Sequence, residues 1–172
     1  GLNASQIEGD NMSGFHQFGL NAGGGVYFKM HPKWSLSTEI LYSMRGANGT
    51  PYINGVPVAY PAILRINTDY LEVPVFASFH DKKYAMFGAG LSMAGLVRYN
   101  YLEQGKEMRD SSNFANLYKR YDLSLFGNVT FFLHDHIGLN FRWSYSLIPF
   151  TTSVAVDPQS HHVICIRMMY MF

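Results

Sequence analysis

Strict two-residue alternation between apolar and polar side chains constrains this sequence more than any other feature. In the segment GLNFRWSYSL, Leu139, Phe141, Trp143, Tyr145 and Leu147 share one face, and Gly, Asn, Arg and Ser occupy the other. Side chains alternate between the two faces of a β-strand, whereas helical positions repeat every 3.6 residues. Helical periodicity is nearly absent from the chain. The sequence therefore predicts an all-β protein.

Eight segments carry this alternation, and all but the first are long. They span roughly Gly1–Gln6, Phe15–Met30, Trp34–Gly46, Arg65–Phe79, Tyr84–Tyr99, Lys119–Leu133, His136–Phe150 and His161–Phe172. A tilted strand needs roughly 9–11 residues to cross the hydrocarbon core of a bilayer. Strands of ordinary globular domains are about 5–6 residues long. The segment lengths therefore favour strands that span a membrane.

The connections between these segments alternate in length. The tight ones are His31–Lys33, His80–Lys83 and His134–Asp135, and the long ones are Ile7–Gly14, Ala47–Leu64, Asn100–Tyr118 and Thr151–Ser160. Short periplasmic turns and long extracellular loops are typical of outer-membrane barrels. We therefore predict one domain over residues 1–172. It is a closed, up-and-down, antiparallel, eight-stranded transmembrane β-barrel with both termini on the periplasmic, short-turn side.

Composition supports a membrane barrel. Charged residues make up 15% and aromatic residues 16% of the chain, whereas soluble domains are about a quarter charged. Aromatic residues crowd the strand ends, as membrane interfaces require. The short-turn set is Tyr27, Phe28, Trp34, Tyr84, Tyr170 and Phe172, and the long-loop set is Tyr70, Tyr99, Tyr101, Tyr118, Tyr121 and Tyr145. The alternative is a soluble lipocalin-like barrel or sandwich, whose apolar faces would point inward.

Four stretches and the Phe-terminated last strand point to one family. The stretches are GLNAS (1–5), EILYSMRG (39–46), DYLEVPVFASF (69–79) and GAGLSMAGLV (88–97). Together they resemble the PorT-like outer-membrane β-barrel family of Bacteroidetes, and the architecture is similar to small OmpX/OmpA-type barrels. The resemblance implies an eight-stranded barrel in a Gram-negative outer membrane, with a removed signal peptide. Most members of the family have no defined activity.

The charges predicted to face the lumen form the best-defined candidate site. By parity, Glu39, Glu72, Arg142 and Arg167 all point inward at similar depth. Isolated charges in a narrow interior are costly, but paired ones are tolerable. We expect a polar plug, because an eight-stranded barrel holds little more than side chains. The alternative is a gate or a proton path. Hydrogen bonds to the cluster are expected from Asn21, Asn128 and Asn140.

A second set of charges is predicted at the barrel mouth. It consists of Arg45, Arg98, Arg120 and Asp122. Such groups bind the phosphates of lipopolysaccharide or anionic sugars, or they simply form a solvated rim. Among the long loops, the apolar and tyrosine-rich Ala47–Leu64 is a candidate contact surface for an unknown extracellular ligand, together with Asn100–Tyr118. The partners expected are therefore outer-membrane lipid, lipopolysaccharide and a ligand of the loops.

Other chemistry is not indicated. The formal net charge of +1 gives no reason to expect nucleic acid, and the single Cys165 excludes an internal disulfide. The HDH turn at 134–136 is too tight to converge three ligands, and the histidines have no metal-site spacing. A lipid-modifying outer-membrane enzyme is a further alternative, but no motif links Ser, His and Asp into a catalytic set. We expect a non-enzymatic protein without metal or cofactor.

The last strand combines an apolar face with a central Arg167. Parity turns Arg167 into the lumen, toward Glu39 or Glu72, and places Tyr170 and Phe172 on the lipid face. An aromatic strand of this kind resembles the signal that the outer-membrane assembly machinery reads. Pro74 lies within a predicted strand, where it removes a ladder hydrogen bond, so a bulge or irregular pairing is expected there.

Overall fold

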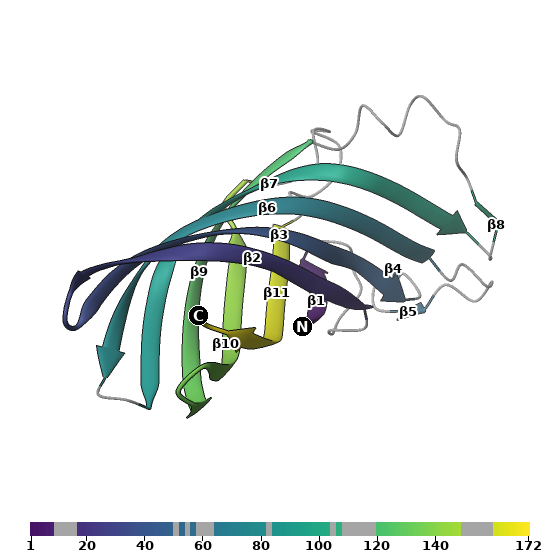
Figure 1. Ribbon diagram of the computed structural model, residues 1–172. Coiled ribbons are helices and arrows are strands. Elements are labelled where there is room, and N and C mark those ends of the chain that lie inside the picture. The colour runs from purple at the N-terminus through teal and green to yellow at the C-terminus, as the bar shows by residue number, and fades with distance from the viewer. Residues whose placement is uncertain are drawn as a thin grey trace.

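The computed structural model describes residues 1–8, 17–49, 52–53, 56–57, 64–81, 84–103, 106–107, 120–148 and 160–172. Its long strands are β1 (Leu2–Glu8), β2 (Gln17–His31), β3 (Trp34–Gly49), β6 (Leu64–Asp81), β7 (Ala85–Glu103), β9 (Tyr121–His134), β10 (Ile137–Ser146) and β11 (Ser160–Tyr170). Figure 1 shows them curving around one common axis. In these ranges, no helix has the length and apolar character needed to cross a membrane.

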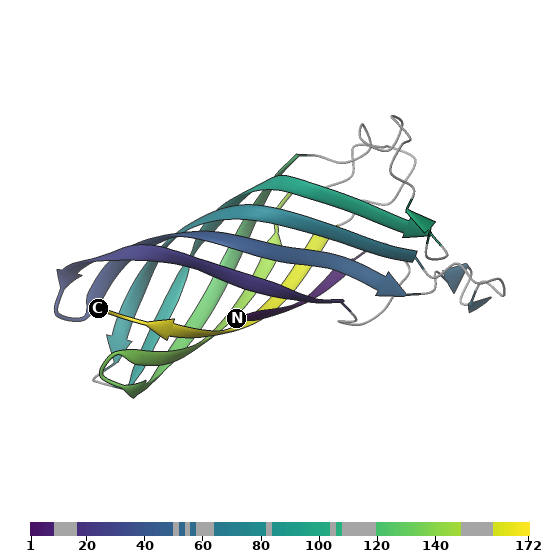
Figure 2. The same cartoon turned by 45° about the vertical axis from the view of Figure 1, so that its right-hand side comes forward.

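The eight long strands form a closed ring. Each pairs antiparallel with its neighbours in chain order, from β1 and β2 through to β10 and β11. The ring closes between the first and last strands, where Leu2 lies opposite Ile166. Figure 2 shows the barrel from the side, with the long strands strongly tilted. The predicted fold class, a closed eight-stranded antiparallel barrel, is confirmed.

Polar side chains line the interior of this barrel and apolar side chains cover its exterior. Along β9 the alternate residues from Asp122 to Thr130 are buried, whereas Tyr121, Leu125 and Phe131 are exposed. On β10 and β11 the exposed side chains include Trp143 and Ile166. A soluble barrel would place these apolar faces inside, away from water. The soluble alternative is therefore wrong.

The strand ends differ from the sequence prediction mainly at the long-loop side. β3 and β7 extend several residues further than expected, and β10 ends at Ser146 rather than Phe150. Three two-residue strands lie beyond the ring. β4 (Tyr52–Ile53) pairs with β5 (Val56–Pro57), and β8 (Lys106–Glu107) folds back on β7. Most of the four predicted long loops lies outside the described residues.

Pro74 interrupts one ladder without shifting its register. On the β7 side it lies opposite Ser92, within an unbroken series of pairs. On the β3 side, the pairs pass from Thr38–Val75 to Leu41–Glu72 with Glu39 and Ile40 unpaired. The missing amide hydrogen of proline accounts for this gap. The irregular pairing expected at Pro74 is therefore present, but the register shift of β6 falls between Asp69 and Tyr70 instead.

Candidate functional site

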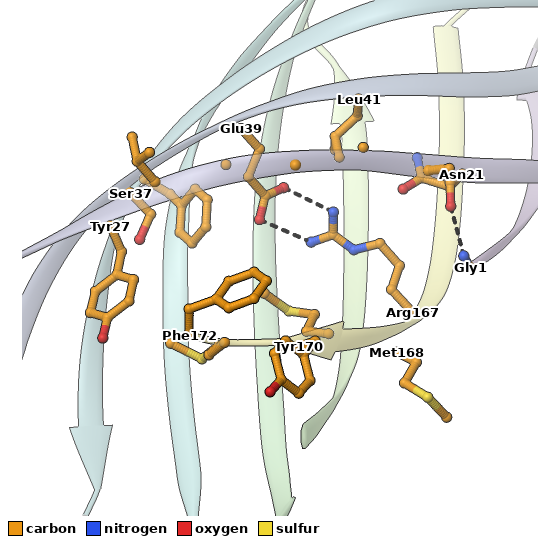
Figure 3. A pocket seen from close by; sticks show the side chains of 18 of the residues that line it. Gly1, Asn21, Tyr27, Ser37, Glu39, Leu41, Arg167, Met168, Tyr170 and Phe172 are labelled. Atoms are coloured by element: carbon orange, nitrogen blue, oxygen red, sulfur yellow. Dashed lines mark hydrogen bonds and ion pairs between the residues drawn. The ribbon is translucent and has the colours of Figure 1, made fainter. Parts of the chain in front are cut away.

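The lumen contains two separate groups of buried charges. The first, here called the short-turn cluster, consists of Glu39, Asn140, Arg142 and Arg167. Glu39 Oε2 accepts hydrogen bonds from Arg142 Nη2 at 2.9 Å and from Arg167 Nη1 at 2.8 Å. One carboxylate from β3 thus joins two guanidinium groups from β10 and β11. Figure 3 shows Arg167 reaching across toward Glu39.

The second group, here called the loop-end cluster, consists of Arg45, Glu72, Asp122 and Ser146. Arg45 donates to Glu72 Oε1 from Nε at 3.0 Å and from Nη2 at 2.6 Å. Its Nη1 atom donates to Asp122 Oδ2 at 2.7 Å, and the hydroxyl of Ser146 donates to the other oxygen of Asp122. A single guanidinium group therefore connects β3, β6 and β9.

The formal charges of the two clusters balance. Glu39 with Arg142 and Arg167 sums to +1, and Arg45 with Glu72 and Asp122 sums to −1. Together they carry three positive and three negative charges, so the formal charges of the two clusters cancel. Buried charges are tolerated when they are paired and hydrogen-bonded in this way. The arrangement holds strands together across the lumen.

Three aromatic side chains fill the lumen beside these charges. They are Tyr70, Phe76 and Phe126, and all are buried. The Arg142 guanidinium lies 4.2 Å from the ring centre of Phe126 and 5.6 Å from that of Phe76. Arg45 lies 5.0 Å from the ring centre of Tyr70. Cation–π contacts of this kind are strengthened where water is excluded, so the rings support both clusters.

The sequence prediction grouped these charges differently. It placed Glu39, Glu72, Arg142 and Arg167 in one cluster. In the structure Glu39 forms ion pairs with both Arg142 and Arg167, whereas Glu72 forms its ion pair with Arg45. It also placed Arg45 and Asp122 at the barrel mouth, which is wrong, because each is only 3% exposed. Strand tilt is the reason. Residues at equal counts from a turn do not lie at equal depth in a tilted barrel.

The remaining predicted mouth residues lie on the surface. The side chains of Arg98 and Arg120 are both exposed. Neither joins the ion pairs of the two clusters that the described residues form. Both side chains are therefore accessible to solvent near the long-loop end.

Of the three asparagines expected to support the cluster, Asn140 does so. Its Oδ1 accepts from Arg167 Nη2 at 2.9 Å, and its Nδ2 donates to Thr130 Oγ1 at 2.8 Å. Asn128 is buried, but neither polar atom of its side chain has a partner in the described part of the chain. The side-chain oxygen of Asn21 likewise lacks one. The supporting role expected of Asn21 and Asn128 is therefore not seen.

Sequence reasoning missed one polar group on the outer face. Asp69 precedes the register shift and shares the outward face of Leu71, yet it is only 6% exposed. Tyr42 donates to Asp69 Oδ2 at 2.7 Å. Asp69 also lies opposite Arg98 of β7. An acidic residue on an apolar face is the signal that identifies such a site from sequence.

The aromatic ends of the strands agree with the prediction in part. At the short-turn end Trp34, Tyr84, Tyr170 and Phe172 are exposed on the outside, and the rings of Tyr170 and Phe172 meet edge-to-face at 4.9 Å. At the long-loop end Tyr121 is exposed. The prediction that Tyr70 belongs to the aromatic girdle is wrong, because its side chain is buried in the lumen on the same face as Glu72. The side chains of Tyr99, Tyr101 and Tyr118 lie outside the described residues.

In the described ranges, no group of three His, Cys, Asp or Glu side chains is placed to hold a metal ion. The fold and lumen instead define a class: a closed β-barrel with an apolar exterior and a charged interior. The model of the family described as outer membrane protein beta-barrel domain matches residues 1–152. The chain belongs to this family, and its place is the outer membrane.

A solved structure shares the fold. It is the crystal structure of Ail, the attachment invasion locus protein of Yersinia pestis, in complex with the heparin analogue sucrose octasulfate. The TM-score is 0.56 at 12% sequence identity, and the alignment covers 100% of this chain and 94% of that one. At this identity the likeness concerns the fold alone. No curated protein sequence matches the chain.

Proposed function

We propose that this protein is a non-enzymatic outer-membrane barrel whose lumen is closed by its own side chains. The observation that carries the proposal is the pair of charge clusters. Arg45 spans from β3 to Asp122 on β9, and Glu39 spans from β3 to Arg142 on β10. These links cross the lumen at two levels, and the rings of Phe76 and Phe126 occupy space beside them. An eight-stranded barrel leaves little further room for a channel.

Bilayer recordings test the closed lumen. We expect the purified protein, reconstituted into planar bilayers, to show no stable open level. Incorporation is verified by fluorescent labelling of the reconstituted protein, so that an absence of conductance shows that the lumen is closed. A matched variant, Arg45→Ala with Arg142→Ala, removes a guanidinium from each cluster and is expected to give small, flickering conductance. Large and stable conductance of the unaltered protein would contradict a closed lumen.

We further propose that the long-loop end binds anionic groups such as lipopolysaccharide phosphates or sulfated sugars. The exposed Arg98 and Arg120 support this second function. Ail, which shares the fold, was crystallised with a heparin analogue. The predicted loops Ala47–Leu64 and Asn100–Tyr118 would add contacts to an extracellular ligand.

Variants that remove a positive charge without adding a negative one test anion binding. Arg98→Gln with Arg120→Gln is expected to weaken retention on immobilised heparin and on lipopolysaccharide vesicles at least several-fold, with retention of the unaltered protein falling as salt rises. Lys29→Gln with Lys33→Gln is the matched control, because both lysines are exposed at the opposite end. Equal loss in both variants would point to non-specific charge attraction and would reject the proposed site.

The remaining features are proposed on the resemblance to PorT-like barrels of Bacteroidetes. We propose that residues 1–172 form a single domain with short turns and both termini in the periplasm. The exposed ring pair of Tyr170 and Phe172 would contact the outer-membrane assembly machinery. Incubation with lipid A, phospholipid and peptide substrates tests the non-enzymatic role, since turnover of any of them would refute it.

A further inference from the structure

A β-bulge in β7 turns one arginine toward the outside of the barrel. Leu96 has inward parity, because it lies opposite Tyr70, which is buried in the lumen. In a regular strand Arg98 would share that inward face. The register instead shifts, so that Arg98 lies opposite Asp69 and Val97 is the extra residue of the bulge. Bulges re-aim side chains in this way. Figure 1 shows β6 and β7 running side by side toward the long-loop end.

Arg98 shares the outer face of the barrel with Asp69, because residues directly opposite in an antiparallel pair lie on the same face. Asp69 lies on the outer face because the hydroxyl of Tyr42, which is exposed there, donates to its Oδ2 atom at 2.7 Å. Asp69 is nevertheless buried, whereas Arg98 is exposed. A ligand that approaches from outside therefore meets the guanidinium group and not the carboxylate, which favours an anionic headgroup over a zwitterionic one.

Arg98 lies directly beyond the apolar part of the barrel wall. Toward the short turns, every outward side chain of β7 from Val97 to Phe87 is uncharged. This stretch has the roughly 9–11 residues that a strand needs to cross the hydrocarbon core. Tyr42 and Tyr121, both exposed, lie in the adjacent row of paired residues. Tyrosines on the outer face mark the depth of the lipid headgroups, so Arg98 lies at headgroup depth.

Open space adjoins Arg98 on this outer face. A Cβ added at Gly95 of β7 would meet no atom within 4 Å. Leu71 of β6 lies opposite Gly95 on one side and Tyr121 of β9 on the other, and both side chains are exposed on the outside. An aliphatic and an aromatic side chain therefore flank a gap in the side-chain cover of the wall. Apolar groups of a lipid pack well against such neighbours.

We propose that this surface, here called the outer-wall site and formed by Leu71, Gly95, Arg98 and Tyr121, binds one phosphorylated lipid of the leaflet at the long-loop end. The site rests on the anion binding proposed for that end, and it narrows the ligand to a lipid anchored in the membrane. The guanidinium group donates hydrogen bonds to the lipid phosphate. The apolar part of the lipid packs over Gly95, between Leu71 and Tyr121. A soluble sulfated sugar uses the arginine alone and has no contact with the apolar part of the site.

Asp69 fits this site as the counter-charge of Arg98. A charge beside the hydrocarbon is costly when it is isolated, and the carboxylate opposite Arg98 keeps it from being so when no lipid is bound. The hydrogen bond from Tyr42 holds that carboxylate on the outer face. A guanidinium group has five N–H donors, and a bidentate pair with a carboxylate uses only two of them. Donors therefore remain for the oxygens of a phosphate.

Binding of a defined lipid tests the outer-wall site. Native mass spectrometry of the barrel in a neutral detergent counts bound molecules of diphosphoryl lipid A, and of the same lipid after dephosphorylation, at graded concentrations. We expect one diphosphoryl lipid A per barrel and weaker binding, by at least several-fold, of the dephosphorylated form. Arg98→Gln should weaken diphosphoryl lipid A binding roughly ten-fold, because it removes charge-assisted hydrogen bonds. Lys33→Gln is the charge-matched control at the opposite end and should bind as the unaltered protein does.

Gly95→Phe separates the outer-wall site from anion binding in general. It fills the open space without removing a charge, so we expect lipid A binding to fall at least several-fold while retention on immobilised heparin stays unchanged. Gly127→Phe is the matched control. Gly127 faces outward on β9 within the apolar wall, and a Cβ added there meets only one backbone atom, at 4.0 Å. The heat-modifiable migration of each variant on an unboiled gel confirms that it is folded.

The two proposals fail in different ways. If Arg98→Gln weakens binding of both ligands but Gly95→Phe binds lipid A as tightly as the unaltered protein, anion binding stands and the outer-wall site is overturned. Equal binding of diphosphoryl and dephosphorylated lipid A would also overturn the site, because apolar contact alone would then suffice. If Arg98→Gln with Arg120→Gln changes binding of neither heparin nor lipid A, anion binding at this end is itself refuted, and the outer-wall site with it.

Discussion

Arg167 and Glu39 face one another across the lumen, with 2.8 Å between Nη1 and Oε2 and 3.4 Å between Nη2 and Oε1. The two residues are 128 positions apart and belong to the last strand and to β3. Glu39 also holds Arg142, so a single carboxylate neutralises two arginines that would otherwise repel each other. The stability of this part of the lumen therefore depends strongly on one acid.

Glu39→Gln is expected to lower the free energy of unfolding by about 3–5 kcal/mol, because it leaves two buried guanidinium groups without a counter-charge. Urea unfolding in detergent micelles measures the change. The exposed Lys29→Gln is the control and should have little effect. Replacing the whole group, with Glu39→Gln, Arg142→Met and Arg167→Met together, should recover much of the loss, since an apolar substitute for a buried ion pair is often neutral. No loss in the single variant would contradict the assigned pairing.

Arg45→Ala is expected to destabilise the barrel by a similar amount, about 3–5 kcal/mol, because it leaves the buried carboxylates of Glu72 and Asp122 without a counter-charge. Arg45→Lys keeps the charge but loses the fork that reaches two acids at once, so we expect an intermediate loss. The same unfolding assay ranks the three proteins. If the lysine variant matched the unaltered protein, the geometry of the guanidinium would be irrelevant and charge alone would suffice.

Asn140 and Asn128 form a matched pair for testing hydrogen bonds in the lumen. They are 1% and 8% exposed, respectively, but only Asn140 binds Arg167 and Thr130. Asn140→Ala leaves these partners unsatisfied and should cost about 1–3 kcal/mol. Asn128→Ala removes an amide without partners and should cost clearly less. Thermal unfolding followed by circular dichroism compares the two, and equal losses would mean that burial rather than bonding sets the cost.

The sequence was sufficient to predict much of this molecule, for identifiable reasons. Two-residue parity depends only on strand geometry, so it predicted that Glu39 and Arg167 point inward. Alternating connection lengths similarly led to the ring order. The pairing of Arg45 with Glu72 was missed because it depends on strand tilt and stagger, which a single sequence does not specify. Asp69 has the same outward parity as Leu71, but parity does not show that Tyr42 of the neighbouring strand would hydrogen-bond to it.

The aromatic residues of the lumen were missed for another reason. Small side chains dominate the inward positions, so the sequence prediction did not place Phe76 and Phe126 in the lumen, although both obey the same parity. The structure shows why the two sizes occur together. Gly90 lies opposite Phe76 on one neighbouring strand and opposite Phe126 on the other. The glycine leaves the space that the two rings fill.

This complementarity gives a prediction with an internal control. A Cβ at Gly90 would lie 2.5 Å from Phe76 Cβ and would also meet the carbonyl of Val75. Gly90→Ala should therefore destabilise the barrel by about 1–3 kcal/mol, the usual cost of overpacking. At Gly95, on the same strand, an added Cβ meets no atom within 4 Å. Gly95→Ala should be neutral or slightly stabilising, because alanine restricts the unfolded chain.

The urea unfolding midpoints of Gly90→Ala and Gly95→Ala in the same detergent test this prediction, because the substitution is chemically identical and only the surroundings differ. Gly90→Ala combined with Phe76→Leu provides a second readout. Leucine keeps the Cα and Cβ atoms that the added methyl group would meet, so the double variant should lose about the sum of the two single changes. A loss clearly smaller than the sum would contradict this reading and would show that the packed rings cause the strain at Gly90.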